Sequence, residues 1–125
     1  MKRDVVITFT QYDYLDDIEE KKYDIKAVLN DNKLIYKDNE TDAEVHITVE
    51  NNGIHIHRIC DTITDIELIE GGIAQAKVSS QFGEMLFNTK LLEKVTNENE
   101  IAIEYQLLGD EEIITHKKII WTIGQ

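Results

Sequence analysis

Apolar and polar residues alternate along almost the whole chain, and short clusters of Asn, Asp and Gly interrupt the alternation. In a β-strand every second side chain lies on the same face, whereas an amphipathic helix repeats about every 3.6 residues. No stretch of the sequence offers a convincing helical pattern. The pattern therefore predicts an all-β, antiparallel structure built from short strands and tight turns.

The first predicted strand begins at Val5 and keeps its apolar phase as far as Phe9. Tyr12 then falls in the opposite phase, which predicts a β-bulge or a bend near Gln11. The acidic residues that follow predict a loop, or at most one helical turn. Alternation resumes at Tyr23, and its phase places that side chain inside the protein.

Three two-residue hairpin loops are predicted in the next part of the chain, at Asp31-Asn32, Asn39-Glu40 and Asn52-Gly53. The first loop sets Leu29 opposite Leu34, the second sets Leu34 opposite Val45, and the third sets Ile47 opposite Arg58. All three keep the apolar side chains on one face, and a slip of one residue would turn a strand over. The sequence therefore predicts four successive strands with a common inner face, to which Arg58 belongs.

The alternation does not fix the register of residues 61–95. One strand is expected near residues 63–69, and a Gly-Gly pair at 71–72 marks a turn or a bulge before a second strand. Another strand is expected at residues 82–89, and residues 91–95 fit either a strand or one helical turn.

The last two predicted strands cover residues 101–107 and 113–123. The Gly-Asp pair between them is a hairpin signal, but a strict two-residue loop would place Leu107 opposite Glu112. We therefore expect a bulge or a longer loop at this turn. With that adjustment Trp121 and the apolar residues at alternate positions point inward.

Eight to ten strands joined mostly by short loops favour a closed barrel over an open sheet, because closure removes exposed strand edges. The chain has no Pro to protect such edges. A two-sheet sandwich would show the same alternation, but the turns pair consecutive strands, as in an up-and-down meander. Because the sequence shows no linker or repeat, we expect residues 1–125 to form one antiparallel barrel domain.

The charge balance is strongly acidic, because 13 Lys and Arg stand against 25 Asp and Glu and give a net charge of −12. Such a surface repels nucleic acid and anionic membranes, so we expect neither as a partner. No apolar run suits a signal peptide or a membrane helix, and the single cysteine, Cys60, allows no intrachain disulfide. We therefore expect a cytoplasmic protein, a monomer or a homodimer, without a cofactor.

Three segments of the sequence are similar to segments of a known protein family. An Asn-Gly turn leads into a strand that ends at Arg58, the residues Phe-Gly-Glu-Met-Leu at 82–86 are followed by Thr89, and Ile-Ala-Ile-Glu-Tyr at 101–105 precedes Leu-Gly-Asp at 108–110. With these segments the sequence resembles the YwiB-like family of uncharacterised small bacterial proteins. The resemblance spans most of the length and implies a calycin-like, lipocalin-type β-barrel. It implies no activity, since the family has none that carries over.

The predicted inner face carries four residues with polar tips, Arg58, Tyr36, Tyr105 and Trp121. A buried guanidinium must be paired, and near a barrel mouth it would bind the carboxylate or phosphate of a ligand. The tyrosines and the tryptophan would orient the same guest. The alternative is structural: Arg58 forms an ion pair or reaches water at the rim, and the aromatic rings fill the core.

His46, His55 and His57 fall on the predicted outer face of one hairpin, with His55 opposite Glu50. Imidazoles and a carboxylate are suitable ligands for zinc or nickel. That face is solvent, however, and the spacings match no structural zinc pattern. The sequence therefore predicts an ordinary polar face and no metal site. The face of His116 depends on the bulge in the last hairpin.

Catalytic motifs are missing from the sequence. Cys60 has apolar neighbours and no activating base nearby in the sequence. The serines at positions 79 and 80 lack a nucleophile elbow, and the Gly-Gly pair lacks the strand-to-helix context of a phosphate loop. An enzyme is therefore unsupported, and a hydrolase or isomerase in the barrel mouth is the weakest hypothesis.

Two other hypotheses stay open. The first is a non-enzymatic barrel whose interior binds a small apolar or amphipathic molecule, with Arg58 and the tyrosines fixing its polar end. The second is an interaction or structural module with a filled core, which works through its acidic surface or by self-association. The two hypotheses differ in how much of the barrel interior the protein's own side chains occupy.

Overall fold

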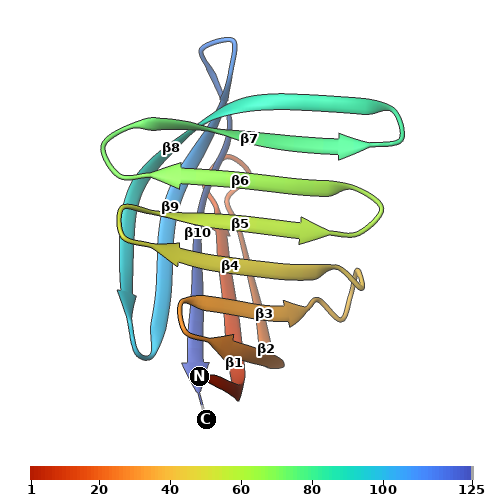
Figure 1. Ribbon diagram of the computed structural model, residues 1–125. Coiled ribbons are helices and arrows are strands. Elements are labelled where there is room, and N and C mark those ends of the chain that lie inside the picture. The colour runs from red at the N-terminus through yellow and green to blue at the C-terminus, as the bar shows by residue number, and fades with distance from the viewer. Residues whose placement is uncertain (125) are drawn as a thin grey trace.

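The structure is a computed structural model, and it describes residues 1–124. All the regular elements in this range are strands (Figure 1). Their bounds are β1 Lys2–Asp13, β2 Ile18–Asn30, β3 Lys33–Lys37, β4 Glu44–Glu50, β5 Gly53–Ile59, β6 Ile63–Ile69, β7 Ile73–Ser80, β8 Gly83–Asn97, β9 Glu100–Gly109 and β10 Glu112–Gly124. Residues 1–124 contain no helix suited in length and apolarity to crossing a membrane.

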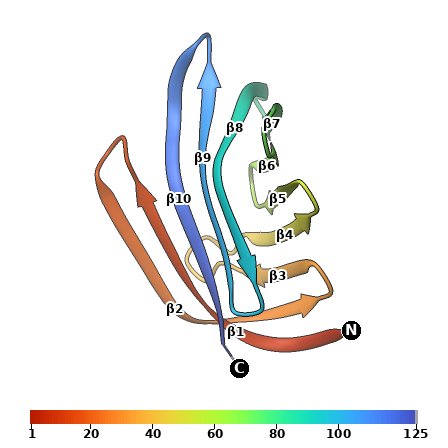
Figure 2. The ribbon, with the colours of Figure 1, turned by 90° about the vertical axis from the view of Figure 1, so that its left-hand side faces the viewer.

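Every strand pairs antiparallel with its neighbours in the sequence, and β10 pairs with β1 to close the ring. The closed, up-and-down barrel predicted from the alternation is therefore confirmed, and the sandwich is excluded. β3–β7 cross β8–β10 at a steep angle (Figure 1). In the view turned by 90°, β3–β7 form one wall of the barrel, and the β1–β2 and β9–β10 hairpins stand on the other side (Figure 2).

The first predicted hairpin is confirmed, because Leu29 lies opposite Leu34. The second has the wrong register. The loop between β3 and β4 spans residues 38–43 instead of two residues, so Leu34 lies opposite Ile47 and not opposite Val45. The Asp38 carboxylate organises this longer loop, because it accepts hydrogen bonds from the Glu40 amide and the Thr41 hydroxyl.

The third predicted hairpin is also wrong by two residues, because its loop is Asn51-Asn52. Ile47 therefore lies opposite Ile56, and Arg58 lies opposite Val45. A shift of two residues leaves every side chain on its own face of the sheet. The predicted inner face of these four strands survives both errors, and Arg58 belongs to it.

A bulge in β2 overturns the prediction for Tyr23. Tyr23 and Asp24 together occupy the space opposite Thr8, and Asp24 adopts a positive φ of 55°. The bulge turns Tyr23 outward, where it is 64% exposed, and the prediction that it lies inside is wrong. Lys22 takes the inner face instead. The bulge predicted near Gln11 is also wrong, because β1 pairs with β10 without a break.

The structure settles three segments for which the sequence left alternatives open. The acidic stretch turns at residues 14–17, and β2 begins directly after it. Residues 91–95 are strand, with a bulge where β8 pairs with β9. The last hairpin turns at Asp110-Glu111, both with positive φ, and the bulge predicted there lies between Ile113 and Thr115.

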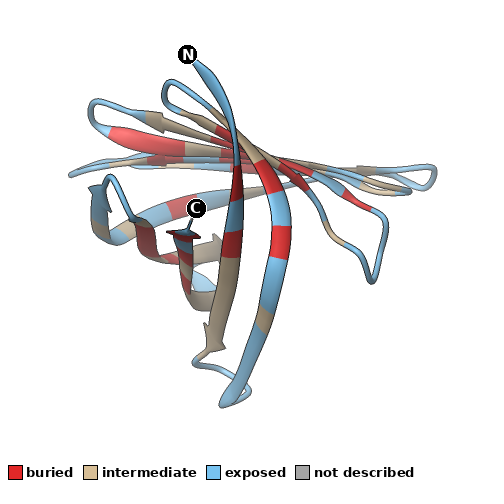
Figure 3. Ribbon diagram, turned by 90° about the horizontal axis from the view of Figure 1, so that it is seen from below, coloured by how far each residue is buried: buried red, intermediate tan, exposed pale blue. Residues whose placement is uncertain are grey.

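The core occupies the barrel interior, and its buried positions recur at alternate residues along the strands (Figure 3). The large inward residues predicted for the last strand are confirmed as buried. The largest fully buried side chains are Trp121, Ile7, Leu34, Ile47, Ile54, Leu68, Ile103 and Thr89. The Thr89 hydroxyl is satisfied in this apolar setting because it donates to the Glu67 carbonyl oxygen at 2.6 Å.

Candidate functional site at the mouth of the barrel

In an up-and-down barrel, alternate loops lie at the same end. We call the mouth the end that carries the β1–β2, β3–β4, β5–β6, β7–β8 and β9–β10 loops. Its inward-facing side chains are only partly covered. Met85 faces inward opposite Val78 yet is 58% exposed, and Phe87 and Leu107 are half-buried. The core therefore closes the barrel away from the mouth and leaves the mouth itself open.

Arg58 is the last inward-facing residue of β5, and its side chain is partly buried at the mouth. Its guanidinium donates to the Thr41 hydroxyl at 3.0 Å and to the Cys60 sulfur at 3.3 Å. A guanidinium has five N–H donors, and within residues 1–124 no carboxylate forms an ion pair with it. Arg58 is thus oriented by neutral partners and keeps donors for an anion.

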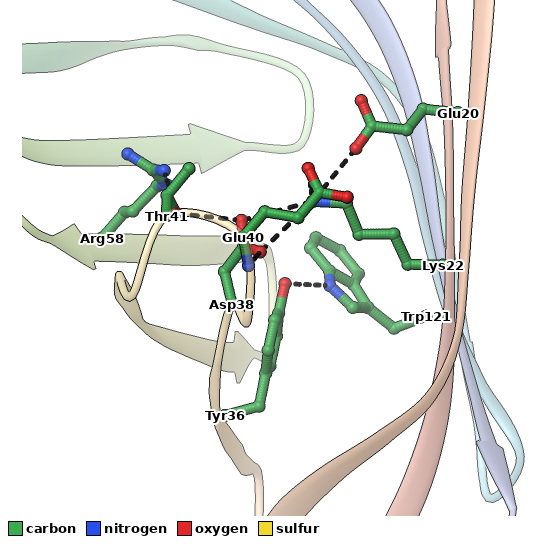
Figure 4. Close-up of polar contacts among 8 residues, drawn as sticks. All are labelled: Glu20, Lys22, Tyr36, Asp38, Glu40, Thr41, Arg58 and Trp121. Carbon is green, nitrogen blue, oxygen red and sulfur yellow. Dashed lines mark hydrogen bonds and ion pairs between the residues drawn. The ribbon is translucent and has the colours of Figure 1, made fainter.

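The β2 bulge turns Lys22 inward, and carboxylates surround Lys22, in contrast to the neutral partners of Arg58 (Figure 4). Its ammonium lies 3.1 Å from Glu20, 3.2 Å from Asp38 and 3.5 Å from Glu40, and its side chain is 20% exposed. Thr41 links the two cations, because its hydroxyl accepts from Arg58 and lies 3.1 Å from Asp38. The charge of Lys22 is therefore neutralised within the protein.

The pKa values of this cluster reflect the balance between burial and pairing. Burial alone would raise the pKa of the Asp38 carboxyl, but hydrogen bonds from the Glu40 amide, Lys22 and Thr41 outweigh burial and lower it. Burial alone would lower the pKa of Lys22, but hydrogen bonds to Glu20 and Asp38 raise it. Both groups are held in their charged forms at neutral pH.

Two of the predicted ligand-binding residues, Tyr36 and Trp121, meet directly beneath this cluster (Figure 4). The Trp121 indole N–H donates to the Tyr36 hydroxyl oxygen at 2.9 Å, in a buried contact. Burial raises the pKa of Tyr36 to about 12, so its hydroxyl stays protonated. Phe9 packs beside Trp121 at 6.3 Å between ring centroids, and the Lys22 ammonium lies 5.9 Å from the centroid of the Phe9 ring.

Tyr105 is buried on β9 and takes no part in the hydrogen bonds of Arg58, Tyr36 and Trp121. Burial raises its pKa to about 12, with a smaller contribution from the negative charge of Asp13. The structure thus brings together Arg58, Tyr36 and Trp121, and it leaves Tyr105 apart.

The histidines lie outside the barrel. His57 is directly opposite His46, and His55 is opposite Thr48, because the hairpin register differs by two residues from the prediction. His116 also faces outward, and its Nε2 lies 2.8 Å from Glu104. Three ligand atoms that could hold a metal ion come together on this outer surface, from His55, His57 and Asp65.

Two depressions on the protein lie away from Arg58. One of about 870 Å³ lies outside the barrel over β1–β5, where Val28, Ile35 and Ile59 contribute to its lining. Another, of about 710 Å³, lies at the end opposite the mouth, beside Arg3 and Leu29. The depressions with a measurable volume and the cluster of polar groups around Arg58 and Lys22 therefore lie at different places on the protein. We base the site on chemistry, because a few convergent polar groups determine how a ligand is oriented.

Sequence reasoning missed Lys22, Asp38 and Thr41. A bulge two residues beyond Lys22 hides its inward orientation, although the paired lysines at 21 and 22 before the outward Tyr23 offer a faint signal. Asp38 and Thr41 lie in a loop that was predicted to be shorter. Loop residues have no alternation to place them.

The protein-family models and the curated proteins searched contain no match to this chain. The crystal structure of the YwiB protein from Bacillus subtilis is similar, with a TM-score of 0.69 over 98% of this chain and 92% of that chain, at 13% sequence identity. At this identity the likeness shows the fold alone. The chain therefore has a YwiB-like fold, which the resemblance in its sequence predicted.

Proposed function

We propose that the mouth of the barrel binds a small amphipathic molecule, whose single anionic group pairs with Arg58. The observation that carries this proposal is a partly buried guanidinium that has no carboxylate partner among residues 1–124, although Glu40 and Asp38 belong to the neighbouring loop. A partly buried cation of this kind is stabilised by an anion, and a carboxylate or phosphate matches its planar array of donors.

The apolar part of the ligand would lie on the uncovered inner face of the mouth. Met85, Phe87 and Leu107 supply flexible and aromatic apolar surface there. The buried Tyr36–Trp121 pair forms the floor below and limits how deep a ligand enters. These features support a lipocalin-type carrier in which the guest sits near the entrance, because the core already fills the rest of the interior.

The negative charge of the protein restricts the charge and size of the anionic group that a ligand can carry. The protein carries a net charge of −12, and Glu20, Asp38 and Glu40 surround Lys22 at the same end. A polyanion such as a nucleotide would be repelled. A monoanion, small enough to reach Arg58 without approaching these carboxylates, is the ligand class that fits. We propose that such a carrier works in the cytoplasm.

A second candidate function is an interaction module. The depression outside β1–β5 supports it, because Val6 and Ile59 are both more than a third exposed beside it. In that case Arg58 would serve only to organise the β3–β4 loop through Thr41. The two candidates differ in whether the mouth binds a small ligand at all.

The test uses two ligands with the same number of carbon atoms, decanoate with an anionic head group and decanol with a neutral one. We expect decanoate to bind the purified protein with one site by calorimetry, and decanol to bind at least about tenfold more weakly. Arg58→Leu should weaken decanoate binding by about 10–100-fold, because a charge-assisted hydrogen bond contributes about 1.5–3 kcal/mol. Arg3→Leu is the matched control, since Arg3 is the other arginine and lies at the opposite end.

Three results would contradict the proposal. Equal binding of decanoate and decanol would show that charge is not recognised. Loss of binding in Arg3→Leu but not in Arg58→Leu would move the site to the other end of the barrel. No binding of either ligand, together with a dimer in native mass spectrometry, would favour the interaction module.

A further inference from the structure

We propose that His55, His57 and Asp65 form a binding site for a divalent transition-metal ion on the outer surface of the barrel. The geometry differs from the expectation of an ordinary polar face, because Asp65 comes from β6 and its position could not be read from the β4–β5 hairpin alone. The site lies on the other face of the sheet from Arg58 and does not depend on the proposed ligand.

The strands position these three side chains. His55 and His57 are two residues apart on β5, so both point to the outer face. Asp65 lies directly opposite His57 in the register of β5 with β6. The ligands therefore lie on the outer face of two paired strands of the closed barrel, which hold them more rigidly than a loop would.

The distances suit a small metal ion. One ligand atom from each residue lies within 4.8 Å of the others. The His57 Nδ1 is 3.5 Å from Asp65 Oδ1, and the His55 Nε2 is hydrogen-bonded to the same oxygen. In a tetrahedral zinc site with bonds of about 2.0–2.1 Å, two ligand atoms lie roughly 3.4 Å apart. Small side-chain rotations of the imidazoles would bring all three atoms to this spacing.

The donor set selects the class of metal. Two imidazoles and one carboxylate suit zinc and its neighbours in the first transition row, whereas calcium and magnesium require oxygen ligands. Three protein ligands leave one coordination position for water or another ligand. His46 lies across from His57, with 6.4 Å between ring centroids, but its Nε2 contacts Glu44 at 2.9 Å. We therefore assign three ligands and not four.

The surrounding charges allow a cation to bind. Lys77 lies opposite Asp65 in the register of β6 with β7, but its ammonium pairs with Glu84 at 3.1 Å. The net charge of −12 attracts cations to the surface in general. The side chains of the three ligands are between 32% and 43% exposed, so an ion reaches them directly from solvent.

The experiment is a titration of the full chain with Zn²⁺ by calorimetry, repeated in the presence of excess Mg²⁺. We expect one bound Zn²⁺ per chain, undiminished by Mg²⁺, with an affinity that falls as the pH is lowered because protons compete for the imidazoles. His57→Gln and Asp65→Asn should each weaken binding by at least about tenfold. Both positions are partly exposed, and circular dichroism checks that the variants remain folded.

His116→Gln is the matched control. His116 is also an outward-facing histidine paired with a carboxylate, Glu104, but it is not part of the three-residue cluster. Unchanged Zn²⁺ binding in this variant supports the site. The proposal is overturned if the native chain binds no Zn²⁺, if the two ligand variants bind as the native chain does, or if His116→Gln loses as much affinity as they do.

Discussion

Tyr36 and Trp121 show how a single hydrogen bond constrains the floor of the mouth. The Trp121 side chain is 1% exposed, so its indole N–H depends on the Tyr36 hydroxyl, 2.9 Å away, as an acceptor. An unsatisfied buried donor costs about 1–3 kcal/mol. The same burial raises the pKa of Tyr36 to about 12, which keeps the hydroxyl neutral over the whole physiological range.

Tyr36→Phe removes this acceptor and leaves the ring. We expect it to lower the free energy of unfolding by about 1–3 kcal/mol, measured by urea denaturation. Tyr23→Phe is the control, because Tyr23 is 64% exposed and should change stability by less than about 0.5 kcal/mol. Equal effects of the two substitutions would show that the bond contributes nothing.

Asp38 gives a prediction on pH. Its folded-state pKa is lowered, because hydrogen bonds outweigh burial, so it stabilises the fold above the usual carboxyl pKa. This stability is lost as pH falls through the folded-state pKa. At pH 7, Asp38→Asn should therefore cost about 1–2 kcal/mol, and the difference from the native chain should shrink below about pH 4.

Thermal or urea unfolding of both chains across this pH range checks the expectation. Asp42→Asn, in the same loop, is the control, because the Asp42 side chain is 81% exposed. A difference between the native chain and Asp38→Asn that stayed constant with pH would rule out the ionised carboxylate as its source.

At the scale of the strands, alternation predicts faces well and registers less well. Leu34 and Arg58 were placed on the correct face although two hairpins were misaligned by two residues, because faces repeat with the same period. A bulge, in contrast, reverses faces. The β2 bulge depends on the positive φ of Asp24, and an Asp residue occurs in many strands and turns without forming a bulge. The alternation therefore did not predict the reversal of the faces of Tyr23 and Lys22.

Gly53 tests how closely two strands approach. A methyl group at this position would overlap the backbone carbonyl oxygen of Leu68, which a rotamer change cannot relieve. We expect Gly53→Ala to lower the free energy of unfolding by about 1–3 kcal/mol. Gly72→Ala should have little effect, because a methyl group there meets open space and the backbone φ is ordinary.

Circular dichroism melts of the two variants provide the comparison. If Gly53→Ala melted at the same temperature as Gly72→Ala, the close approach of β5 to β6 would be wrong. A destabilised Gly53→Ala would instead confirm a position at which only glycine fits, although the sequence predicted no more than a turn residue.

At the scale of the whole molecule, closure of the barrel by β1 and β10 separates an inner face from an outer one. The sequence predicted this division, and it predicted that Arg58 lies inside and that His46, His55 and His57 lie outside, while it left the face of His116 open. It could not predict which groups from distant strands meet, such as Lys22 with Asp38 or His57 with Asp65. These contacts depend on bulges and loop lengths, which the alternation of apolar and polar residues does not encode.

The central claim is that the mouth recognises an anionic group through Arg58. The most direct measurement follows the indole N–H resonance of Trp121, the single tryptophan, during titration with decanoate. We predict a saturable change in this chemical shift in the native chain and in Arg3→Leu. In Arg58→Leu the affinity obtained from the titration should be about 10–100-fold lower. An unmoved Trp121 resonance, or identical titrations of the native chain and Arg58→Leu, would contradict the account.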